Sequence, residues 1–121
     1  MNSPLGWHWI ADQERPKKMA NGWQIVFRAE IVDASSGRPD GWSYALILQD
    51  QNEDRLLGFD NSHAFDNAAD GDRFDHEHRF GRVGQRVQYR FVSVQQLVVD
   101  FFERVERVCL AQGVAFEFED R

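Results

Sequence analysis

Residues 23–31 read WQIVFRAEI, and this stretch decides the class of the fold. Apolar side chains occupy every second position of it, and polar side chains such as Arg28 and Glu30 fall between them. Successive side chains of a strand point to opposite faces, so this alternation predicts a strand with one buried face. The dipeptide Asn21-Gly22 directly before the stretch is typical of a turn and marks where the strand begins.

Two further pairs of strand-like segments follow along the chain. The apolar runs 44–48 and 56–59 flank a short polar turn, which predicts a first hairpin. Residues 76–80 and 87–92 flank the glycine-containing segment 81–85, which predicts a second hairpin. Together with the strand described above, these segments predict an antiparallel sheet of four to five strands.

A long helix is expected near the C-terminus. Ser93 and Gln96 form a capping box, in which Ser93 accepts from the third helical N–H and Gln96 reaches back to the N–H of Ser93. Apolar residues then recur at helical spacing, at Val94, Leu97, Val98, Phe101, Val105, Val108 and Cys109. Gly113 is the expected stop. The sequence thus predicts an α+β fold, a single antiparallel sheet with this helix packed on one face.

The length of 121 residues suits one domain, with residues 1–21 as an N-terminal arm and residues 62–74 as a flexible loop. No apolar run approaches the roughly 20 residues of a membrane span, and no export signal is recognised, so we expect a cytoplasmic protein without a membrane partner. The single cysteine, Cys109, falls on the apolar face of the helix and is expected to be buried and inert.

A homodimer is expected from the number of large aromatic side chains on the sheet. Those of Trp23, Phe27, Trp42 and Tyr44 could not all lie under a single helix. Contact with a second copy would bury the remainder.

Arginines gather in one segment although the chain as a whole is acidic. The net charge of -6 argues against general coating of nucleic acid, because that attraction depends on Lys and Arg. Residues 73–90, however, carry five arginines against two acids, Asp75 and Glu77. This local basic surface could meet RNA or an acidic partner, and a solvated arginine face of no function is the alternative.

Three of the four histidines lie within residues 55–79. If residues 75–80 are extended, His76 and His78 share one face of the strand, and Asp75 and Arg79 lie on the other. Imidazole titrates near neutral pH, so such a pair can hold one group as a base and the other as an acid. The alternative is that both histidines hydrogen-bond neighbouring carboxylates and only close the edge of the sheet.

A metal site is a further alternative for these histidines. His76 and His78 could hold a divalent ion together with Asp60 or Asp75. The same spacing is common in strands that bind nothing, so the sequence predicts neither a metal nor another cofactor. The acidic loop 62–74 lacks the ligand spacing and the final glutamate of a calcium loop, which excludes calcium.

Three strings in this sequence resemble the TumE-like family, small bacterial proteins known as toxins of type II toxin–antitoxin pairs. They are RLLGFDN at residues 55–61, DHEH at residues 75–78, and YRF at residues 89–91 leading into the helix. The similarity covers roughly residues 44–108. In the family the segment before Asp-His is short and carries glycine and lysine, whereas loop 62–74 here is longer and acidic and has no lysine.

The resemblance implies a toxin that acts on RNA and is neutralised by a helix-turn-helix antitoxin. Metal-free cleavage of RNA needs a base, an acid and a cation for the phosphorane charge. We assign catalysis to five residues that could supply or orient these groups, namely His76, His78, Asp60, Asp75 and Arg79. Substrate binding is assigned to Arg55, Asn61 and Arg82, of which Arg55 and Arg82 are also alternatives to Arg79 as the cation. A non-catalytic protein-binding domain and a metal-dependent hydrolase are the competing hypotheses.

Overall fold

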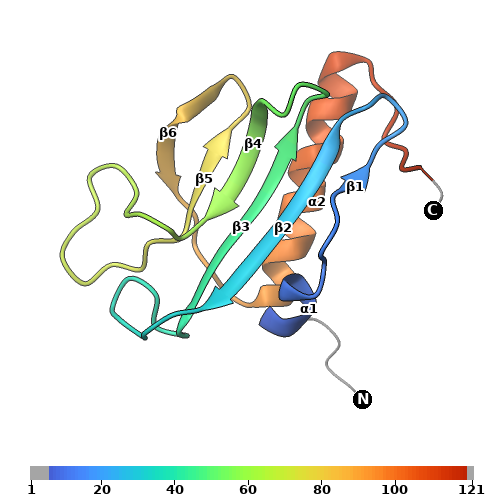
Figure 1. The fold of residues 1–121 in the computed structure, drawn as a ribbon. Helices are drawn as coiled ribbons and strands as arrows, with labels where there is room; N and C mark the ends of the chain where they lie inside the picture. Colours follow the sequence, from blue (N-terminus) through green and yellow to red (C-terminus); the bar gives the residue numbers. More distant parts are fainter. Residues whose placement is uncertain (1–5, 120–121) are drawn as a thin grey trace.

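The computed structural model describes residues 6–119, and its main elements are a six-stranded antiparallel sheet and a long helix (Figure 1). The elements in chain order are α1 (Trp7–Ala11), β1 (Lys17–Lys18), β2 (Gln24–Ile31), β3 (Trp42–Gln49), β4 (Arg55–Asp60), β5 (His76–Arg79), β6 (Arg82–Gln88) and α2 (Val94–Gln112). Each strand pairs with the next in the chain, so the spatial order is also β1 to β6. The predicted α+β class and C-terminal helix are confirmed.

The prediction of four to five strands is wrong, because the sheet has six. The additional strand is β1, which pairs with the start of β2 through Lys17 and Lys18. Two residues are too few to show the alternation by which strands are recognised in a sequence. The C-terminal segment also contacts this edge, since Ala20 N–H donates to Glu117 O at 2.9 Å.

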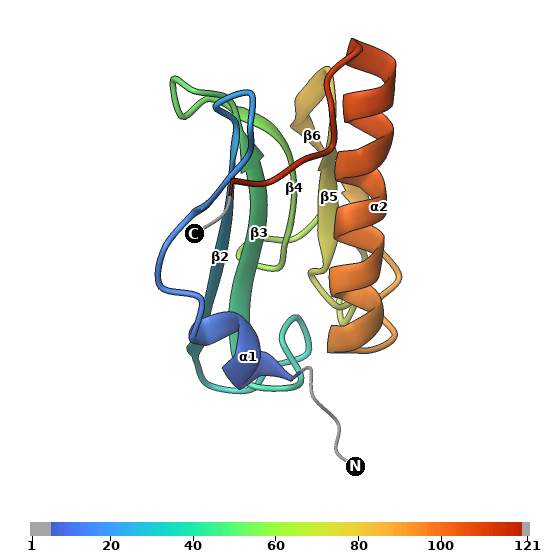
Figure 2. The same cartoon turned by 90° about the vertical axis from the view of Figure 1, so that its right-hand side faces the viewer.

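The core lies between α2 and one face of the sheet (Figure 2). On that face Phe27 of β2 and Phe59 of β4 each meet the ring of Phe101 edge-on, with centroids 6.1 Å apart. In the described part of the chain no helix lies along the opposite face (Figure 2). We call this opposite side the open face.

The N-cap and the C-cap of α2 are the predicted residues, and one predicted hydrogen bond is missing. The hydroxyl of Ser93 accepts from Gln96 N–H at 3.0 Å, and Gly113 ends the helix in the left-handed conformation with φ of 69°. The side chain of Gln96 donates instead to Asp100 at 2.8 Å, so the second half of the expected capping box is not formed. Cys109 is buried, as predicted. Neither helix of residues 6–119 is long and apolar enough to cross a membrane.

The N-terminal arm contains a short helix that the sequence did not predict. A helix of five residues has almost no stability in isolation, so α1 depends on tertiary packing. Trp7 stacks on Phe91 at 5.6 Å and on Trp42 at 6.2 Å, and Ile10 is fully buried. This packing covers aromatic side chains that we expected a second copy to bury. The homodimer therefore stays a prediction without that support.

The second hairpin is tighter than predicted. Residues 80 and 81 alone form the turn, with Gly81 at a φ of 80°, and β6 begins immediately after them. The predicted turn at 81–85 and strand at 87–92 are therefore misplaced. Two-residue hairpin turns favour glycine where φ is positive, as at Gly81. The prediction extended the turn to residue 85 because it counted Gly84 as a second turn residue.

Loop 62–74 has no helix or strand, but backbone contacts tie it to the domain at both ends. Asp66 N–H donates to Arg86 O at 3.1 Å, which extends the pairing at the β6 edge. Phe74 N–H donates to Gly37 O at 2.9 Å. The predicted flexibility of the loop stays a prediction.

Candidate functional site

The paired strands β4 and β5 bring Asp60, His76 and His78 together on the open face. Asp60 stands directly opposite His76 in the antiparallel register. His78, two residues further along β5, points to the same face and stands opposite Gly58. We call Asp60, His76 and His78 the Asp-His cluster.

Four polar atoms of the cluster lie close together, namely the two Nε2 atoms and the two carboxylate oxygens of Asp60. His76 Nε2 lies 3.1 Å from Asp60 Oδ1, and His78 Nε2 lies 3.2 Å from Asp60 Oδ2. The two Nε2 atoms are 3.1 Å apart. The sequence predicted that the histidines share a face, and the structure confirms this and adds Asp60 as their common partner.

Backbone carbonyls fix the orientation of both imidazole rings. His76 Nδ1 lies 2.8 Å from Phe74 O, and His78 Nδ1 lies 2.5 Å from Val83 O. A carbonyl oxygen only accepts, so each Nδ1 carries a proton and donates. A neutral imidazole then presents a lone pair at Nε2, toward the carboxylate and the other ring.

These carbonyl partners could not be found from the sequence, because every residue has a carbonyl group. The register between β5 and β6 shifts after Glu77, and Val83 lies within the irregular part of β6. A strand irregularity of this kind turns backbone groups away from the ladder. One such group, Val83 O, is therefore free to accept from His78.

The carboxylate of Asp60 is stabilised in its ionised form. Burial alone would raise the pKa of Asp60, but hydrogen bonds from His76 and His78 outweigh it and hold the pKa well below the usual range. Ser62 N–H also donates to Asp60 Oδ1 at 3.0 Å. Each bond from an Nε2 requires a proton there, so the cluster needs positive charge to be satisfied. The guanidinium of Arg55, 4.0 Å from Asp60 Oδ2, supplies part of it.

The cluster is largely shielded from solvent. The side chain of His76 is fully buried, and those of His78 and Asp60 are 9% and 11% exposed. A ligand that arrives from the open face would therefore reach Asp60 and His78 first.

Asp75 is not brought to the histidines. Its fully buried carboxylate lies on the helix-facing side of the sheet, where Tyr44 Oη donates to it at 2.9 Å and Arg73 Nε at 2.7 Å. Arg73 in turn stacks over the ring of Phe91 at 4.3 Å. This placement agrees with the strand alternation and makes Asp75 part of the scaffold.

The remaining predicted residues differ in their distance from the cluster. Arg79 Nε lies 3.7 Å from Glu77 on the helix-facing side, and Arg82 is exposed at the start of β6. Asn61 is buried and prolongs the β3–β4 pairing, since its Oδ1 accepts from Tyr44 N–H at 3.0 Å. Of the predicted cations, Arg55 is the one that the structure brings to Asp60.

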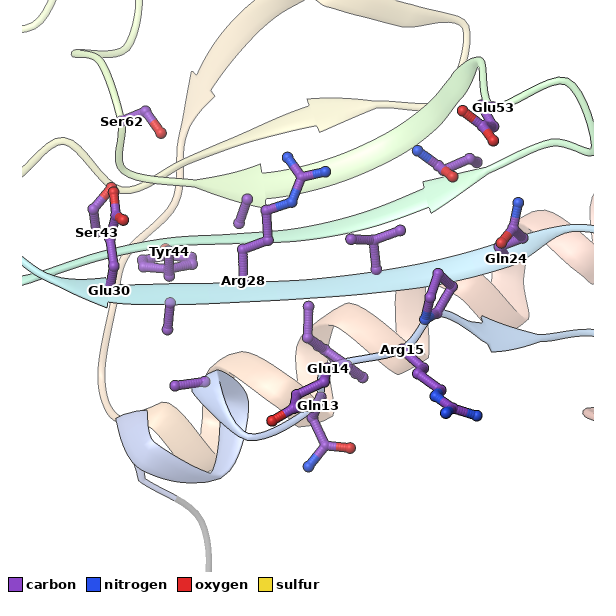
Figure 3. A pocket seen from close by; sticks show the side chains of 17 residues that line it. Gln13, Glu14, Arg15, Gln24, Arg28, Glu30, Ser43, Tyr44, Glu53 and Ser62 are labelled. Atoms are coloured by element: carbon purple, nitrogen blue, oxygen red, sulfur yellow. The ribbon is translucent and has the colours of Figure 1, made fainter. Parts of the chain in front are cut away.

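A groove of about 660 Å³ lies beside the cluster, between residues 13–16 and strands β2 and β3 (Figure 3). Arg28 of β2 and Ser62, just beyond β4, belong to its lining. Arg28 stands opposite Ala45, and Ala45 stands opposite Asp60, so the three side chains form one row across the open face. Ala45 lies between the groove and the cluster, and its small side chain protrudes little from the sheet.

Comparison with known proteins supplies the family. No curated protein matches the chain, and no solved structure does. A family model described as Toxin TumE matches residues 16–109, which include every strand, the Asp-His cluster and most of α2. By that match over most of its length, the chain belongs to the TumE toxin family.

Proposed function

We propose that the protein is the toxin of a toxin–antitoxin pair and acts on RNA through the Asp-His cluster. The observation that carries this proposal is the convergence of three titratable groups, within 3.2 Å of one another, on a sheet face that no helix of residues 6–119 covers. Such clusters are costly to bury, and they occur mainly where chemistry or binding uses them. Membership of the TumE toxin family supplies the biological setting.

The surroundings of the cluster favour a phosphate-bearing substrate. Arg55 lies 4.0 Å from Asp60, and Arg28 stands in the same row two strands away. Adjacent strands are about 4.8 Å apart, so the two cations flank the carboxylate within about 10 Å. Phosphates along a nucleic-acid strand that passes over the small side chain of Ala45 could contact both arginines.

The roles within the cluster follow from exposure. His78 and Asp60 are the more exposed members of the cluster and are the two that face the substrate. His76 is fully buried and holds the charge of Asp60, so it acts as a positioning residue. Arg55 serves as the cation for charge that develops on the phosphate. The antitoxin, which the family implies as a partner, would neutralise the toxin by covering this face.

Expression in a bacterium without the antitoxin gene tests the proposal. Wild-type protein should arrest growth, and His78→Gln and Asp60→Asn should not. Circular dichroism of the purified variants checks that both are folded. His63→Gln is the matched control, because it removes an exposed histidine outside the cluster and should leave the arrest intact. Total RNA sampled in the first minutes should show new fragment ends only with wild type and the control.

Two outcomes would contradict the proposal. Equal growth arrest by wild type and by folded His78→Gln would remove the Asp-His cluster as the site. Arrest with intact RNA would remove RNA as the substrate and leave the toxin function standing.

A non-catalytic binding function is the second candidate. It is favoured by the burial of His76 and by the polar contacts that all four imidazole nitrogens make within the protein. An arrest that depends on Arg28 and Arg55 but not on His78 would select this reading.

A further inference from the structure

We propose that Asp60, His76 and His78 bind one divalent transition-metal ion, through the Asp60 carboxylate and the two Nε2 atoms. All three ligand atoms lie within 4.8 Å of one another. The inference rests on the geometry of the Asp-His cluster, and it holds whether or not RNA is the substrate.

The spacing of the two Nε2 atoms and the Asp60 carboxylate fits ligands around a common ion. Bonds of about 2.1 Å at angles of roughly 90–109° place neighbouring ligand atoms about 3.0–3.4 Å apart. The two Nε2 atoms are 3.1 Å apart, and each lies near a different oxygen of Asp60: His76 Nε2 is 3.1 Å from Oδ1, and His78 Nε2 is 3.2 Å from Oδ2.

The imidazole rings are also oriented as metal ligands are. A histidine that binds a metal through one nitrogen almost always donates its other N–H to a carbonyl or a carboxylate. Both His76 and His78 do so, to Phe74 O and Val83 O. Both free lone pairs then point to the same place, where two acceptors and a carboxylate face one another without a donor between them.

A single shared proton is the alternative source of the positive charge. One proton on one Nε2 can lie between two acceptors, but three acceptor groups meet here, so one of the short contacts would remain unfavourable. A divalent ion contacts all three simultaneously. Arg55 does not prevent this, because its guanidinium lies 4.0 Å from Asp60 on a side chain that is 36% exposed and can turn toward solvent.

The donor set indicates which ions fit. Two imidazoles and one carboxylate suit Zn²⁺, Fe²⁺ and Mn²⁺, whereas Mg²⁺ and Ca²⁺ prefer oxygen ligands only. Three protein ligands leave at least one coordination position for water or for a substrate oxygen. The ion would supply a Lewis acid at that position, and the register of β4 and β5 holds Asp60 and His76 in place for it.

Metal content measured by mass spectrometry tests the proposal. The protein is purified without an affinity tag, stripped with a chelator, and dialysed against a zinc buffer. We expect about one zinc ion per chain, and a Co²⁺-loaded sample should show visible absorption bands. A folded wild-type protein that retains no zinc and gives no cobalt spectrum would overturn the proposal.

Ligand variants and a matched control localise the ion. His78→Gln and Asp60→Asn should weaken zinc binding by more than the roughly 10–100-fold that outer-shell changes cost. His63→Gln and His8→Gln remove histidines outside the cluster and should bind zinc as wild type does. Unchanged affinity in folded His78→Gln would overturn the assignment, and so would loss of binding in either control.

A nuclear magnetic resonance readout on the wild type guards against variants that fail to fold. Zinc should shift the Nε2 resonances of two histidines while their Nδ1 atoms stay protonated, and the other two histidines should not respond. A shift at Nδ1, or at neither nitrogen, would contradict the site. Because these measurements do not use RNA, a failed toxicity assay and a failed metal assay remain distinguishable.

Discussion

Replacement of Asp75 by alanine should lower the free energy of unfolding substantially, because this buried carboxylate is the common acceptor of Tyr44 and Arg73. Removing it leaves the buried hydroxyl of Tyr44 without a partner, which costs about 1–3 kcal/mol. The ion pair with Arg73 adds at most about 1 kcal/mol, since that guanidinium is 34% exposed and screened by solvent. The midpoints sum to about 2.5 kcal/mol.

Urea unfolding of the Asp75 variant gives this quantity directly, provided that the m-value stays unchanged. In the double variant Tyr44→Phe/Asp75→Ala no hydroxyl is left unpaired, so it should be less destabilised than the two single variants added together, by at least about 1 kcal/mol. Asp70→Ala is the matched control, since Asp70 is exposed in the loop and its loss should cost less than about 0.5 kcal/mol. An Asp75→Ala protein of wild-type stability that has lost toxicity would refute the scaffold role and return Asp75 to the site.

Three further predictions concern the helix cap, a packing contact and a tyrosine. Ser93→Ala should destabilise the protein by about 1 kcal/mol, because it removes the hydroxyl that caps α2. Thermal unfolding measures this, with Gln95→Ala as the control. Equal melting temperatures of the two variants would contradict the prediction. Gly37→Ala would place a methyl group 2.5 Å from the Phe74 ring and should lower the free energy of unfolding by about 1–3 kcal/mol. In the control Gly84→Ala the methyl group meets no atom within 4 Å, so stability should not change. Equal stabilities of the two variants would contradict the contact between Gly37 and Phe74. Burial and the neighbouring Asp75 raise the pKa of Tyr44, so its neutral form stabilises the fold fully below its unfolded pKa of about 10 and loses this contribution as pH rises further. The stability gap between wild type and Tyr44→Phe should therefore narrow from pH 9 to pH 11, and a constant gap in urea titrations would argue against the shift.

Sequence periodicity predicted the elements that are long enough to display it. Strand β2 alternates and helix α2 repeats its apolar residues at every third and fourth position, and strands β3 and β4 stand out as continuous apolar runs between polar turns. The two-residue β1 and the five-residue α1 were not predicted, because neither is long enough to show a repeat. Packing of Trp7 and Ile10 stabilises α1, and no local sequence pattern records that packing.

The site was predictable to the same extent and for the same reason. The period of two put His76 and His78 on one face and Asp75 and Arg79 on the other, and the structure agrees. Two features were beyond the sequence. The carbonyl of Val83, which orients His78, is a backbone group in an irregular strand, and the burial of His76 depends on neighbours from distant segments.

The pairing of β4 with β5 has an evolutionary consequence. Asp60 and His76 face each other through strand register, and loop 62–74 contacts the cluster only through its two end residues, Ser62 and Phe74. Doubling the length of a flexible loop costs only about 0.6 kcal/mol of closure entropy. The middle of this loop could therefore be lengthened, shortened or recharged without disturbing the relative positions of the carboxylate and the imidazoles.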